Sequence, residues 1–196
     1  SYLRQPRGRH LALAVASFYG AWAFKHTSVS ILSACCLWFL LQRRFRPLLG
    51  VALPMVGLYA ATFLLGGADY TRAILLSQSG MGFSLRTGRS NLALAAAKSP
   101  FLPSALAALA LQVWATRGRV LREADLSTLA FVVSLVWSSA TAMKLGAYVN
   151  YFFAPAAFGT LWLLRHWRET GGHRRFGRAV AAVLAGGCVL QAGAVT

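Results

Sequence analysis

Apolar runs separated by short basic segments make up most of the chain. The runs cover residues 11–24, 28–42, 48–65, 100–115, 126–143, 147–164 and 179–195. A helix that crosses a bilayer needs roughly 20 apolar residues, so runs of these lengths predict membrane-spanning helices, some of them short. We expect an all-α, polytopic integral membrane protein with about seven transmembrane helices, some short or kinked, in one transmembrane domain over residues 1–196.

The first two runs are separated by Lys25, His26 and Thr27. Two short helices joined by a polar turn explain this pattern better than one long helix, because a lysine at the centre of a span is costly. The third run contains Pro54, where we expect a kink. Gly66 and Gly67 follow the run, and we expect the helix to stop there.

One long connection covers residues 67–99. It contains two weakly amphipathic pieces, residues 70–79 and 91–98. Connections of this length are more often functional than simple linkers. We expect this segment to lie outside and to order against the membrane surface, with Arg72 as an anchor.

Charge narrows the choice of partner. The chain has 20 lysines and arginines against 4 acidic residues, a net charge of +16, and 57% of its residues are hydrophobic. Such an excess of basic over acidic residues is typical of proteins that bind nucleic acid or an anionic membrane. The cations form short clusters between apolar runs, which favours membrane lipids and argues against nucleic acid.

The basic residues also collect in alternate connections. Of the 20, 14 lie in the segments 4–9, 43–46, 117–122 and 165–178. The positive-inside rule then predicts a cytoplasmic N-terminus and an outside C-terminus. The sequence opens at Ser1 with a basic segment that is not a signal peptide, and we expect the chain to be part of a longer membrane protein.

The outer face of this topology is rich in cations and nearly empty of carboxylates. Its candidate binding residues are Lys25, Arg86, Arg89, Lys144, Asn150 and Tyr151. Arginine and lysine offer charge-assisted donors to phosphate oxygens, so the sequence predicts a site for a lipid phosphate group. The simpler interpretation is that the lysines snorkel to the interface and that the amide and the phenol join neighbouring helices.

Asp69 is the carboxylate assigned to the outer face. It is a candidate catalytic acid or base, with helix capping as the alternative role. The histidines and Cys35, Cys36 and Cys188 show no spacing typical of metal ligands, so we expect neither a metal nor a cofactor.

Two short stretches resemble the GT-C glycosyltransferases, multi-spanning enzymes that use polyprenyl- or dolichyl-phosphate-linked sugars and include the protein mannosyltransferase and aminoarabinose transferase families. Ala-Phe-Lys-His-Thr at 23–27 resembles a Phe-Lys-x-Thr turn of bacterial members. Lys-Leu-Gly-Ala-Tyr-Val-Asn-Tyr-Phe at 144–152 is similar to a Lys-x-Gly-x-x-x-Asn-Tyr-Phe stretch. The chain departs from the family at Ala154, where members often carry glutamate, and the loop with the family's catalytic acid has no counterpart.

The resemblance implies the C-terminal part of such an enzyme in a bacterial inner (cytoplasmic) membrane. A polyprenyl-phosphate-linked sugar would bind with its phosphate at Lys25, Lys144, Arg86 and Arg89, and Asn150 and Tyr151 would position the sugar or the helices. The alternative is a non-catalytic structural subunit that binds other membrane subunits through small-residue faces such as residues 134–142. A transporter fits less well, because matched halves are not evident.

Overall fold

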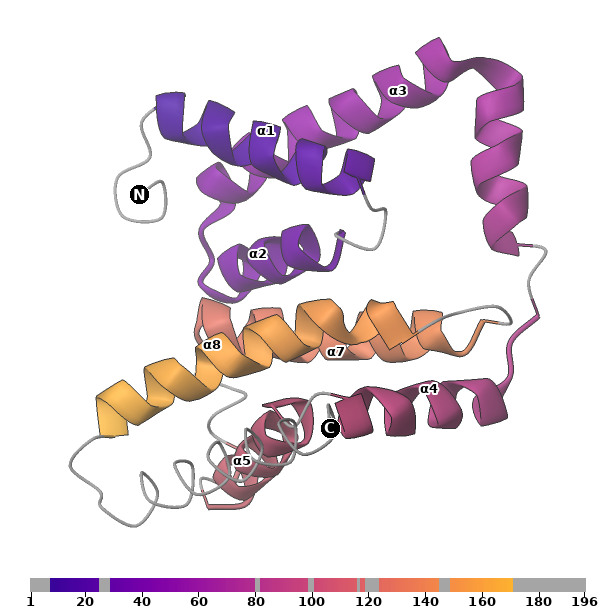
Figure 1. Ribbon diagram of the computed structural model, residues 1–196. Coiled ribbons are helices and arrows are strands. Elements are labelled where there is room, and N and C mark those ends of the chain that lie inside the picture. Colours follow the sequence, from indigo (N-terminus) through magenta and orange to yellow (C-terminus); the bar gives the residue numbers. More distant parts are fainter. Residues whose placement is uncertain are drawn as a thin grey trace. The chain divides into compact units, whose positions relative to one another are not determined.

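The computed structural model describes residues 8–24, 29–79, 82–98, 101–115, 117–118, 124–144 and 149–170. Every regular element in these ranges is a helix, which confirms the all-α prediction for them. The chain divides into two compact units, Ser1–Phe83 and Ser84–Thr196. Figure 1 shows the helices of both units in sequence colours.

The first unit contains α1 (Gly8–Phe24), α2 (Val29–Leu41) and α3 (Phe45–Ser79). α1 and α2 pack against each other, and both pack against α3 (Figure 1). The prediction of two separate helices is therefore confirmed, since one continuous helix could not fold back on itself. The connection between them, residues 25–28, lies outside the described residues.

Apolar packing joins α1 to α3, and an interhelical hydrogen bond adds to it. Tyr19 on α1 and Thr62 on α3 bring their hydroxyl oxygens to 2.7 Å. The Thr62 hydroxyl donates to the carbonyl of Leu58 at 2.8 Å, so Tyr19 is the donor in the interhelical bond. Further core residues of this unit are Val15, Leu32, Phe39, Val51 and Met55.

α3 changes direction at Gly67, whose φ of 75° and ψ of −177° are not helical (Figure 1). The helical conformation is thus interrupted at the glycine pair, where the sequence predicts a stop, and a second helical arm follows at once and continues to Ser79. The amphipathic piece predicted at 70–79 is the second arm of this helix. Pro54, where a kink is expected, lies within the helix before the bend.

The second unit contains α4 (Leu85–Lys98), α5 (Phe101–Ala115), α7 (Leu126–Ala142), the short 3₁₀ helix η2 (Val149–Phe152) and α8 (Phe153–Thr170). α8 packs against both α5 and α7. The core of the unit is formed by Ala95, Leu102, Ala105, Ala108, Phe131, Ala142, Phe152, Trp162 and Leu163.

The boundaries of this unit differ from the expected ones at two places. α4 begins at Leu85, well before the predicted piece at 91–98. The run expected at 147–164 becomes η2 followed by α8, which continues to Thr170. The run at 179–195 lies outside the described residues.

α7 and α8 are antiparallel. Phe131 lies beside Gly159, and Thr128, one turn earlier on α7, contacts Trp162, about one turn later on α8. Gly159 permits this close packing, because a Cβ atom there would lie 2.8 Å from the Ala105 Cβ and 2.9 Å from the Phe131 ring.

One helix among the described residues is long and apolar enough to cross a membrane, the 30-residue stretch Phe45–Ile74 of α3. α4 and α5 meet the same criterion only as a bent pair, and α2 and α7 are apolar but shorter. Within α3, 11% of the most apolar window is buried, and Leu64 and Leu65 are 81% and 89% exposed. This helix therefore presents a large apolar surface to its surroundings, as a membrane helix does.

Candidate functional site

The N-terminal end of α4 is fastened to the C-terminal end of α7. The backbone N–H of Ser84 donates to the carbonyl of Met143 at 2.8 Å. The side-chain amide of Asn91 donates to the carbonyl of Ala142 at 3.0 Å. The last carbonyls of a helix have no partner within it, so α4 supplies two of the donors that the end of α7 needs.

The local sequence explains how α4 begins there and why it comes so close. Ser84 caps α4, because its hydroxyl accepts a hydrogen bond from the N–H of Thr87 at 3.3 Å. Gly88, one turn further on, is buried against Met143. A Cβ atom at Gly88 would lie 2.7 Å from the Met143 Cγ, so the glycine allows the two helices to touch.

Three of the predicted phosphate-binding cations come from these two adjoining helix ends. Arg86 and Arg89 are exposed on α4, on either side of the buried Gly88 in the sequence. Lys144 follows the C-cap of α7 and is half-buried, with its N–H donating to the carbonyl of Thr141 at 3.2 Å. The attachment of α4 to α7 thus brings the helix that carries both arginines to the end of α7 that Lys144 follows, while Gly88 and Asn91 occupy the face of α4 that contacts α7.

The remaining predicted residues of the second unit lie on η2, which packs against α4, α7 and α8. Tyr151 is half-buried in η2. Asn150 belongs to the same turn, but its side chain is outside the described residues. Lys144 and Tyr151 therefore flank the same junction of helices, to which α4 with the two arginines also belongs.

Two other predicted residues belong to the first unit. Lys25 lies outside the described residues, so its expected convergence with Lys144 stays a prediction. Asp69 is exposed on the second arm of α3, two residues beyond the bend.

Lys144 is far from Asp125, whose carboxylate lies in the described part of the second unit. Asp125 caps the opposite end of α7. A helix of 17 residues is about 25 Å long, so Asp125 does not neutralise Lys144, Arg86 or Arg89. The end of the unit that carries these cations is suited to an anionic ligand.

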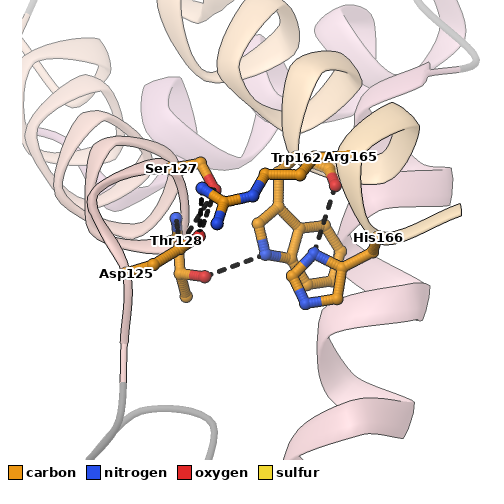
Figure 2. A network of polar contacts seen from close by, with 6 residues as sticks. All are labelled: Asp125, Ser127, Thr128, Trp162, Arg165 and His166. Carbon is orange, nitrogen blue, oxygen red and sulfur yellow. Dashed lines mark hydrogen bonds and ion pairs between the residues drawn. The ribbon is translucent and has the colours of Figure 1, made fainter. Parts of the chain in front are cut away.

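At the Asp125 end, a separate network of polar side chains joins α7 to α8, as Figure 2 shows. The Asp125 carboxylate accepts from the N–H of Thr128 at 2.8 Å and from the Ser127 hydroxyl at 2.9 and 3.0 Å. It also forms an ion pair with Arg165 of α8. The indole N–H of Trp162 donates to the Thr128 hydroxyl at 3.0 Å.

His166 completes the network in Figure 2. Its ring lies over the Trp162 ring with the centroids 4.5 Å apart. Its Nδ1 is 3.3 Å from the carbonyl oxygen of Trp162, to which a protonated Nδ1 can donate. The last turns of α8 are thereby tied to the first turn of α7.

The environment of Asp125 lowers its pKa. Partial burial alone would raise the pKa of this carboxyl, but the hydrogen bonds from Thr128 and Ser127 and the charge of Arg165 stabilise the ionised form and outweigh it. The side chains of Arg165 and Asp125 are 47% and 29% exposed, so their ion pair is partly screened by solvent. We interpret this network as structural, because it holds the first turn of α7 against α8.

Arg165 belongs to a segment predicted to be cytoplasmic, and no contact was predicted for it or for Asp125. One local signal was present, because an aspartate followed by Ser127 and Thr128 before an apolar run is typical of a helix N-cap. The partnership with Arg165 and the contact of Asn91 with α7 join residues far apart in the sequence, and no local pattern indicates them.

In the part of the chain that the structure describes, no group of three or more His, Cys, Asp or Glu side chains is arranged to hold a metal ion. Comparison with protein-family models, with curated proteins and with solved structures finds no match to the chain.

Proposed function

We propose that the chain is the membrane portion of a lipid-linked-sugar-dependent glycosyltransferase of the GT-C type, embedded in a bacterial inner membrane, and that it binds a polyprenyl-phosphate donor at its outer face. Arg86, Arg89 and Lys144 bind the phosphate, with Lys25 as a further contact. Asn150 and Tyr151 position the sugar or the neighbouring helices.

The observation that carries this proposal is the fastening of α4 to α7. Hydrogen bonds of 2.8 Å to Met143 and 3.0 Å to Ala142 hold the helix that bears two arginines against the helix end that Lys144 follows. A phosphate with several oxygens can accept from more than one cation at once, and such charge-assisted bonds are about twice as strong as neutral ones. Asp125 lies at the opposite end of α7, so this carboxylate does not compete with a phosphate for these cations.

Another account of Lys144 needs no ligand. A cation at the C-terminus of α7 is stabilised by the helix dipole, and a lysine at a membrane interface can extend its amine to water. These effects act on Lys144 alone, whereas a phosphate site also requires Arg86 and Arg89. The contributions of the two arginines therefore distinguish the two accounts.

The test is binding of undecaprenyl phosphate to the full chain in lipid nanodiscs, followed by native mass spectrometry. We expect Lys144→Ala, Arg86→Ala and Arg89→Ala each to weaken binding roughly three- to tenfold. Lys98→Ala is the matched control, because Lys98 is an exposed cation at the other end of α4. Equal weakening by Lys98→Ala would mean that binding depends on overall charge, and the proposed site would be wrong.

A non-catalytic subunit is the second candidate, and the position of Asp125 favours it. Asp125 is engaged by Arg165 and caps the end of α7 opposite to the one that Lys144 follows. This carboxylate therefore serves helix packing, and in this account another segment or subunit supplies the acid or base. The reading frame upstream of Ser1 separates the two: an outer loop bearing an aspartate there supports the enzyme, and a nearby start codon supports the subunit.

A further inference from the structure

The apolar stretch of α3 is too long for a single straight crossing. It covers 30 residues, from Phe45 to Ile74. At 1.5 Å per residue a straight helix of that length would measure about 45 Å, against a hydrocarbon thickness of about 30 Å. The arm before the bend, residues 45–66, measures roughly 33 Å and matches that thickness.

The bend that separates the two arms depends on the two glycines at positions 66 and 67. Gly67 has φ 75° and ψ −177°, a conformation that essentially only glycine adopts. At Gly66 a Cβ atom would lie 2.4 Å from the Tyr70 ring, so the ring can lie against the backbone only because this residue is also glycine. The two glycines therefore have separate roles, one in the backbone angle and one in packing.

A hydrogen bond between side chain and backbone spans the bend. The Thr71 hydroxyl donates to the carbonyl of Phe63 at 3.4 Å, eight residues earlier. A break in a helix deprives carbonyls of their usual partners, and an unsatisfied carbonyl is costly near hydrocarbon. The rings of Phe63 and Tyr70 also approach, with centroids 6.2 Å apart. These contacts hold the second arm at a defined direction from the first.

The C-terminal part of α1 packs on the arm of α3 that precedes the bend. Trp22 packs on Tyr59 and Phe63 with ring centroids 4.6 and 6.3 Å away, and α1 ends two residues later at Phe24. Polarity changes at the bend, because the exposed Leu64 and Leu65 come before it and the exposed Asp69 and Arg72 come after it.

We propose that the lipid–water boundary crosses α3 at Gly66 and Gly67, and that residues 68–79 lie along the surface of the bilayer as an interfacial helix. Tyr70 and Arg72 reside in the headgroup region, which tyrosine and arginine favour. The partner of this arm is the phospholipid surface itself. This inference requires α3 to span a bilayer but does not require the chain to be a glycosyltransferase.

The test is a depth profile of α3. Single cysteines at successive positions from Leu53 to Ile74, in a chain whose Cys35, Cys36 and Cys188 are replaced by alanine, carry a nitroxide label in vesicles of phosphatidylcholine and phosphatidylglycerol. Relaxation by oxygen and by a water-soluble nickel complex gives the depth of each label. Before the bend, depth should change by about 1.5 Å per residue; after it, depth should oscillate with a period of about 3.6 residues around a constant value.

Two results would overturn the proposal. A steady change in depth through Ile74 would mean that α3 is one tilted span. Labels after Gly67 that are all relaxed only by the water-soluble reagent would mean that the second arm projects into water.

Gly67→Ala provides a second measurement, because alanine cannot easily adopt the dihedral angles of the bend. We expect this variant to lose the break in the depth profile. Gly57→Ala is the control, since a Cβ atom at Gly57 meets nothing within 4 Å and the residue lies in the same helix. A break that persists unchanged in Gly67→Ala would show that this glycine does not set the boundary. If that variant does not fold, the profile of the unmodified helix decides alone.

Discussion

Asp125 is a single carboxylate with two kinds of partner. It accepts hydrogen bonds from Thr128 and Ser127 at the first turn of α7, and it pairs with Arg165 of α8. Satisfying the free N–H groups of a helix is worth about 1 kcal/mol or somewhat more. A partly exposed ion pair contributes about 0–1 kcal/mol. The cap is thus the larger part of what Asp125 contributes to stability.

Two replacements of Asp125 separate the contribution of the helix cap from that of the ion pair. Asp125→Ala removes the cap and the ion pair, and we expect a loss of about 1–2 kcal/mol in the free energy of unfolding. Asp125→Asn keeps a side chain that caps well and removes only the charge, so its loss should stay below about 1 kcal/mol. Denaturation of both variants in detergent micelles measures the difference. Equal losses would show that the charge of Arg165, and not the cap, dominates.

The lowered pKa of Asp125 predicts a pH dependence with a definite sign. The group binds its proton less readily in the folded protein than its ordinary value of 3.8 implies. Its contribution to stability is therefore fully present above pH 3.8 and is lost as the pH falls through the lower folded pKa.

The difference in melting temperature between the unmodified chain and Asp125→Asn should consequently be constant from about pH 7 to about pH 5 and should shrink below about pH 4. Thermal scans across this range in one detergent give the comparison. A difference that instead changed between pH 6 and pH 7 would contradict the assignment of this pH dependence to Asp125.

Among the elements, the antiparallel pair of α7 and α8 depends on the absence of a side chain at Gly159. A Cβ atom there would meet the Cβ of Ala105 and the ring of Phe131 at less than 3.0 Å. The Ala105 Cβ is fixed to its backbone, so α5 or α8 would have to move. The buried Phe131 ring has little room to yield.

We therefore expect Gly159→Ala to destabilise the protein by about 1–3 kcal/mol, although alanine is the better helix former. The same change at Gly57, which has open space around its Cα atom, should leave stability unchanged or raise it by up to about 1 kcal/mol. Chemical denaturation of the two variants under identical conditions provides the measurement. Similar stability for both would contradict the close packing at Gly159.

The sequence predicted the helices wherever an apolar run ends at a clear signal. Arg43 and Arg44 after α2 and Asp125 before α7 mark boundaries that the structure reproduces within a few residues. The glycine pair at Gly66 and Gly67 was harder to interpret, because glycines that end a helix and glycines that bend one look alike in sequence. The outcome here depends on contacts of Tyr70 and Thr71 across the bend.

The candidate site was predictable only in part, and for a similar reason. Lys144 and its neighbours stand out as polar residues beside an apolar run, and so they could be found locally. The attachment of α4 to α7 depends on Asn91 and Gly88, whose partners lie about 50 residues away in the chain. An asparagine or a glycine within a helix gives no sign in the neighbouring sequence of a contact with a distant helix.

For the whole molecule, the distribution of charge makes the sharpest prediction. The segments 4–9, 43–46, 117–122 and 165–178 hold 14 of the 20 lysines and arginines. If the positive-inside rule applies, all four segments face the cytoplasm. The antiparallel packing of α7 and α8 agrees with this, because it brings Arg165 to the same end as Asp125, which follows the 117–122 segment.

Ser79, at the end of the second arm of α3, should then face the opposite side from Thr116, which follows α5. Single cysteines at these two positions, with Cys35, Cys36 and Cys188 replaced by alanine, can be treated in intact cells with a thiol reagent that does not cross membranes. We expect Ser79→Cys to react and Thr116→Cys to react only after the membrane is permeabilised. The reverse result would invert the orientation and move Arg86, Arg89 and Lys144 to the cytoplasmic face, where an outward-facing donor site is impossible.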